Sequence, residues 1–161
     1  MTLKNAFDEF MFQKELAGLS PASLSDYRNY ITIMLNHVGE SMDLESVTYE
    51  LVAGYIMVLL HRPLSKATIS TYVRNARIFL RWVHAEYGLS FDPVKIKVPK
   101  PPKKNVHVLS SAEIQYLLDS VKCSVPWLTA RNKAIIALML DSGLRQNEVC
   151  ILVKKGLDFD R

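Results

Sequence analysis

The sequence predicts a mainly α-helical protein. Apolar residues recur every three or four positions along most of the chain, serines and prolines stand where helices would begin, and glycines stand where they would end. One segment with four prolines in ten residues interrupts this pattern and cannot be helical. We therefore expect a helical domain over residues 1–97, a proline- and lysine-rich linker over 98–106, and the helical beginning of a second, incomplete domain over 107–161.

Four helices are expected in the first domain, over residues 3–16, 21–38, 51–60 and 66–87. Ser20 precedes Pro21, the order typical of an N-cap followed by proline at the first helical position. Ser65 has the capping role before the long fourth helix. Gly39 and Gly88 end the second and fourth helices.

The second domain opens with a capping box, Ser110-Ser-Ala-Glu113, which predicts a helix reaching about Val121. Residues 134–140 are apolar on every side of a helix, so we expect them to be buried. Gly143 suits a helix C-cap with positive φ, and a last helix is expected over about 146–153.

Composition excludes several classes of protein. The longest apolar run, residues 134–140, is far too short to span a membrane, and the first ten residues lack the apolar stretch of a signal peptide. Cys123 and Cys150 do not make a disulfide framework, so we expect reduced thiols in a cytoplasmic protein. No metal-ligand motif or glycine-rich phosphate loop is present, which predicts no metal and no small-molecule cofactor.

The net charge of +4 is unevenly distributed. Residues 1–60 carry 3 basic and 8 acidic side chains, residues 61–104 carry 10 and 2, and residues 105–161 carry 7 and 6. The corresponding net charges are −5, +8 and +1. A positive middle third is typical of a surface that binds a polyanion.

Within that third, polar and basic side chains of the fourth helix fall within about 80° of its circumference. They are Lys66, Ser70, Arg74, Arg77, Arg81 and His84. No acidic residue lies between Lys66 and Glu86 to pair with them. We expect the first five to contact double-stranded DNA along about 22 Å of helix, and His84 to be an ordinary surface residue. A solvated charged face is the alternative.

Lysines continue the positive charge beyond this helix, at Lys95, Lys97, Lys100, Lys103 and Lys104. We expect Lys100, Lys103 and Lys104 to contact DNA phosphates from an extended linker. The alternative is that they serve solubility alone.

Arg145 follows Gly143 at the start of the last predicted helix, and Glu148 lies three residues later. A cation at a helix start opposes the helix macrodipole, which indicates that it has a partner outside the helix. A guanidinium can hold a phosphate through two parallel hydrogen bonds. Solvated surface residues are the alternative for both side chains.

Several segments carry a family resemblance. They are Leu19-Ser-Pro-Ala-Ser-Leu-Ser-Asp-Tyr27, Leu64-Ser-Lys-Ala-Thr-Ile-Ser-Thr-Tyr-Val-Arg74, Asp92-Pro93, Val108-Leu-Ser-Ser-Ala-Glu113 and, most specifically, Gly143-Leu-Arg-Gln-Asn-Glu148. Together they resemble the tyrosine recombinases of the phage-integrase family. The resemblance implies a SAM-like core-binding domain followed by the beginning of the catalytic domain.

The resemblance also implies roles and partners. Arg145 would be a catalytic arginine that holds the scissile phosphate, and Glu148 would be a supporting residue that positions the site. The family's reaction is a metal-free transesterification through a phosphotyrosyl intermediate. Double-stranded DNA is the implied partner, on which the parent protein would assemble as a tetramer.

The family's remaining catalytic groups are expected after Arg145: a lysine on a β-hairpin, a His-x-x-Arg element and a tyrosine nucleophile. No His-x-x-Arg occurs in this sequence, and its last tyrosine is Tyr116. We therefore expect an N-terminal portion of a recombinase that does not cleave DNA alone. A truncated, non-enzymatic DNA-binding regulator and a helical protein-interaction module are the two alternatives.

Overall fold

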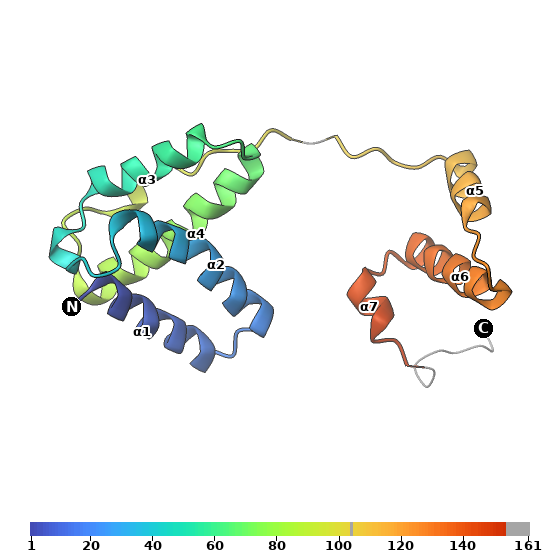
Figure 1. Ribbon diagram of the computed structural model, residues 1–161, viewed down its shortest axis with the longest axis horizontal. Helices are drawn as coiled ribbons and strands as arrows, with labels where there is room; N and C mark the ends of the chain where they lie inside the picture. Colours follow the sequence, from blue (N-terminus) through green and yellow to red (C-terminus); the bar gives the residue numbers. More distant parts are fainter. Residues whose placement is uncertain (104, 154–161) are drawn as a thin grey trace. The chain divides into compact units, whose positions relative to one another are not determined.

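The computed structural model describes residues 1–103 and 105–153 (Figure 1). Within these ranges the chain forms α-helices and two short 3-10 helices, and no β-strand, so the predicted mainly helical fold is confirmed. The α-helices are α1 (Leu3–Leu16), α2 (Pro21–Val38), α3 (Tyr49–His61), α4 (Lys66–Tyr87), α5 (Ser111–Ser120), α6 (Pro126–Ser142) and α7 (Gln146–Cys150). The 3-10 helices are η1 (Leu44–Ser46) and η2 (Pro93–Lys95).

The helix ends in the first part of the chain follow from local capping. The hydroxyls of Ser20 and Ser65 accept hydrogen bonds from backbone N–H groups three residues later, which confirms both predicted N-caps. Gly88 ends α4 with φ of 74°, a conformation that favours glycine. Helix α3 begins two residues before its predicted start, because Thr48 caps it through the Leu51 N–H.

The chain divides into two compact units, Met1–Lys104 and Asn105–Arg161. In the first, α1 to α4 enclose one hydrophobic core. Phe10 of α1 lies at its centre and meets the rings of Tyr27, Phe79 and Trp82 edge-on, with centroid distances of 5.4–5.5 Å. Aromatic pairs in this arrangement stabilise the fold beyond the area they bury.

After Gly88 the chain turns back and packs against α4 through η2. The Ser90 hydroxyl donates to the Val47 carbonyl at 3.0 Å, and Pro93 and Ile96 are buried. This returning segment completes the core of the first unit. It also covers part of the α4 surface, and this bears on the candidate interface.

In the second unit, α5 begins with the predicted capping box. The Glu113 carboxylate accepts from the Ser110 backbone N–H at 2.7 Å and from its hydroxyl, which together hold the pKa of Glu113 below its ordinary value. Helix α6 runs from Pro126 to Ser142, and the φ of 69° at Gly143 confirms the predicted C-cap.

The prediction that residues 134–140 are buried is wrong. None of the described residues of the second unit is buried, and Leu140 is 40% exposed. Helix α6 is apolar on several sides, and its main helix contacts in the part of the chain that the structure describes are with the short helices α5 and α7. Two short helices cannot cover an all-round apolar surface.

The division between the units falls inside the predicted linker, residues 98–106, where the described residues form neither helix nor strand. Within the linker we expect trypsin to cut first after Lys103, which is exposed. Lys100 is followed by a proline, and trypsin cleaves such bonds poorly. The released first unit should retain a cooperative unfolding transition, because it contains the buried core. A sharp transition of a fragment starting at Asn105, followed by circular dichroism, would contradict our account of the second unit.

Candidate nucleic-acid interface

Helix α4 presents only part of the predicted basic stripe to solvent. Lys66, Arg74 and Arg81 are exposed. No carboxylate among residues 1–103 and 105–153 lies within ion-pair distance of these three cations. Their charge therefore remains available to an anionic ligand.

Ser70 does not belong to this exposed surface. Its side chain is 2% exposed, so its predicted place on the outer stripe is wrong. Helix α4 packs against α1, α2, α3 and η2, and its buried face is consequently wider than its apolar residues alone indicate. A hydroxyl on that face cannot reach a ligand at the surface.

Arg77 also departs from its predicted place. It is half-buried, and its guanidinium Nη1 donates to the backbone carbonyl of Ile96 at 3.2 Å. The returning segment therefore covers the part of α4 from which Arg77 projects. Its charge still adds to the local positive potential, but one of its donors is already used.

The lysines that follow α4 continue the positive surface. Lys95, Lys97, Lys100 and Lys103 are all exposed. The predicted contact residue Lys104 lies outside the described residues. Sequence reasoning did not assign Arg62, which is exposed four residues before α4 and belongs to the same positive third of the chain. Its place within the positive residues 61–104 is the sequence signal that could have identified Arg62.

Arg145 lies where the sequence predicts, directly before α7. Its side chain is 86% exposed, and its Nη1 lies 3.4 Å from Oε1 of Glu148. The other carboxylate oxygen of Glu148 accepts from the Arg145 backbone N–H at 2.7 Å. Glu148 thus holds both the backbone and the guanidinium of Arg145 while leaving most of the arginine's donors open to solvent.

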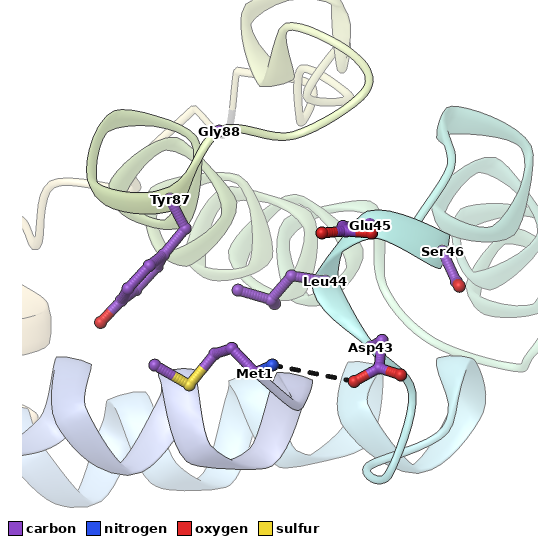
Figure 2. A pocket seen from close by; sticks show the side chains of 7 residues that line it. All are labelled: Met1, Asp43, Leu44, Glu45, Ser46, Tyr87 and Gly88. Carbon is purple, nitrogen blue, oxygen red and sulfur yellow. Dashed lines mark ion pairs between the residues drawn. The ribbon is translucent and has the colours of Figure 1, made fainter.

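A cavity of about 460 Å³ in the first unit differs from this positive surface in its charge (Figure 2). The side chains of Asp43 and Glu45 line it, with Tyr87 opposite (Figure 2). A hydrogen bond to Glu9 raises the pKa of Tyr87 to about 12. Its one cation among the described residues is the Met1 ammonium, which lies 3.8 Å from the Asp43 carboxylate, so the two carboxylates make its electrostatics unsuited to a phosphate ligand.

The described residues contain neither a candidate metal site nor a membrane-spanning helix. Among the described residues, no group of three or more histidine, cysteine, aspartate or glutamate side chains is placed to hold a metal ion. No helix in residues 1–103 and 105–153 has the length and apolar character needed to cross a membrane.

Comparison with known proteins shows the class of protein to which this chain is similar. No family model matches the chain. The tyrosine recombinase XerD of Oceanobacillus iheyensis is 31% identical over 150 residues, which cover 90% of this chain and 50% of the relative. The tyrosine recombinase XerA of Saccharolobus solfataricus is 27% identical, with 98% and 52% of the two chains covered. This chain therefore spans about half the length of these relatives.

A solved structure has the same fold. The Tn1549 transposon integrase, in complex with circular intermediate DNA, matches with a TM-score of 0.76 and 17% identity, over 99% of this chain and 52% of that one. The chain is thus related to the tyrosine recombinases over most of its length, and the resemblance seen in its motifs is confirmed.

Proposed function

We propose that this chain binds double-stranded DNA as part of a site-specific tyrosine recombinase. The observation that carries the proposal is the exposed pair Arg74 and Arg81 on α4, which has no carboxylate partner among the described residues. The solved integrase that shares the fold was captured with DNA, which supports a duplex as the ligand.

The spacing of the two arginines suits phosphate contacts. Seven residues make nearly two helical turns, so both side chains project from one side of α4, about 10 Å apart. A DNA duplex carries one negative charge per roughly 1.7 Å of its axis, and the two guanidiniums can therefore engage different phosphates. Lys66 and the linker lysines add further contacts of the same kind.

Arg145 and Glu148 have a separate role in the proposal. Arg145 binds the phosphate at which the parent recombinase breaks the strand and stabilises the charge that develops there. Glu148 positions Arg145 through the two contacts described above. In the parent, strand exchange proceeds through a phosphotyrosyl intermediate, and four copies assemble on DNA.

The test is the salt dependence of duplex binding, measured as the fluorescence anisotropy of a labelled duplex between 50 and 300 mM KCl, about the range over which phosphate contacts change affinity most. We expect the logarithm of affinity to fall linearly with the logarithm of salt concentration. Its slope should be on the order of −5, because Lys66, Arg74, Arg81, Lys97, Lys100 and Lys103 each release counterions from a phosphate.

Absence of salt-dependent binding would contradict the proposal and favour a helical protein-interaction module. An uncharged polymer of the duplex's length and the same label is the control for non-specific adsorption, and it should leave the anisotropy unchanged.

A further inference from the structure

Arg77 differs from the other two arginines of α4. Arg74 and Arg81 are exposed, whereas Arg77 is half-buried and donates to the carbonyl of Ile96, nineteen residues away in sequence. No carboxylate among the described residues pairs with it. A hydrogen bond from a guanidinium to a carbonyl is charge-assisted and stronger than one between neutral groups.

The bond acts on the point where the linker leaves the first unit. Ile96 is the last buried residue before the linker, and its carbonyl belongs to the peptide that joins it to Lys97. The preceding turn is already fixed, since Asp92 accepts from the Val94 N–H at 2.8 Å and the Ile96 N–H donates to the Pro93 carbonyl at 3.1 Å. Arg77 therefore completes a rigid anchor at residue 96.

The residues after this anchor have a regular spacing. Lys97, Lys100 and Lys103 are three positions apart and exposed, and three prolines separate them, at positions 99, 101 and 102. Prolines favour the polyproline II conformation, which has about 3 residues per turn and a rise of about 3.1 Å per residue. In that conformation, residues three positions apart lie on the same side of the chain about 9 Å apart, which would place the three lysines in one row.

We propose that Arg77 is a positioning residue, which fixes the start of the linker so that the row Lys97, Lys100 and Lys103 faces DNA phosphates. This inference rests on the proposed DNA binding. It assigns Arg77 a role through the linker, in place of the direct DNA contact predicted from the sequence. The constraint weakens with distance from the anchor, so it acts most strongly on Lys97 and least on Lys103.

The first test measures coupling in the whole chain. Lys97→Gln, Lys100→Gln and Lys103→Gln are each combined with Arg77→Met, and duplex affinity is measured. Methionine keeps an unbranched apolar stem and removes the guanidinium donor. We expect the fold loss of duplex affinity caused by Lys97→Gln to be about threefold or more smaller in the Arg77→Met background than in the unmodified chain. The change should be smaller for Lys100→Gln and smallest for Lys103→Gln. Arg77→Lys, which retains a donor, should restore part of the coupling.

Arg81→Met is the matched control, because Arg81 is exposed and the Ile96 carbonyl accepts from Arg77 instead. The change in binding free energy caused by Arg81→Met should add to the changes caused by the lysine variants. Additive effects for Arg77→Met as well would overturn the proposal, and a lowered salt slope would then assign Arg77 a direct phosphate contact.

The second test needs no DNA. Trypsin can cut after Lys97, next to the anchor, and Arg77→Met should speed this cut while Arg81→Met leaves it unchanged. An unchanged rate in Arg77→Met, with the helicity of both variants intact by circular dichroism, would refute the anchor whatever the DNA results are. If the unmodified chain does not bind duplex DNA while Arg77→Met still speeds the cut after Lys97, the proposed function is refuted and the anchor at residue 96 stands.

Discussion

Replacing Arg74 and Arg81 together by glutamate is expected to remove measurable duplex binding near physiological salt. The change deletes two phosphate contacts and places two carboxylates against the same phosphates. Like charges brought together in this way cost several kcal/mol, so affinity should fall about 100-fold or more. The salt slope should become less negative by about 2, because each lost phosphate contact contributes nearly one unit. Anisotropy titrations over a range of salt concentrations measure both quantities.

The fold should survive this change, since both side chains are exposed and neither contributes to the core. Arg77 is left unchanged, because a carboxylate there would lie against the Ile96 carbonyl and disturb the packing of η2 on α4. Far-UV circular dichroism should therefore show unchanged helicity. Loss of helicity would mean that the binding defect reflects unfolding.

The matched control places the same change of net charge on α1, as Lys4→Glu combined with Lys14→Glu. Helix α1 packs on a different side of α4, where the Trp82 indole donates to Gln13 at 2.9 Å. We expect a much smaller loss of affinity than for the α4 pair. An equal loss in both variants would show that net charge, and not the α4 surface, determines binding.

The sequence predicted the bounds of α4 but not all of its exposed face. Its ends are set by local interactions, the Ser65 cap and the Gly88 turn, which can be recognised in the residues themselves. Arg77 is half-buried because the segment after Gly88 returns along α4 and its Ile96 carbonyl accepts from the guanidinium, and Ser70 is buried where α4 packs against neighbouring elements. A helical wheel describes one helix and contains no information about a chain segment that later packs on it.

In the second unit, too, the sequence predicted local turns but not which residues are buried. Gly143 and the order of residues after it predicted the turn before Arg145 correctly, because positive φ at a C-cap is a local property of glycine. Burial of residues 134–140 was predicted from their apolar character alone. Burial also requires partner elements, and in residues 105–153 the main helix contacts of α6 are with the short helices α5 and α7.

The stability of the first unit should depend strongly on Phe10. Its side chain is fully buried and touches three other aromatic rings, from α2 and α4. Phe10→Ala leaves a cavity where these helices meet and should cost about 3–5 kcal/mol. Since a domain of this size has a total stability of about 5–15 kcal/mol, the midpoint of thermal unfolding should fall on the order of 15–30 °C. Calorimetry or circular dichroism at 222 nm, the helix signal, measures this shift.

Phe12→Ala, two residues further along α1, provides a matched control for this prediction. The chemical change is the same, but Phe12 is 59% exposed. Its replacement should alter stability by no more than about 0.5 kcal/mol, because it removes little buried surface and alanine favours the helix. Phe10→Ala should also weaken DNA binding more than Phe12→Ala, since Arg74 and Arg81 are held in register only while α4 packs on α1 and α2. Equal destabilisation by the two variants would mean that Phe10 is not at the centre of the core.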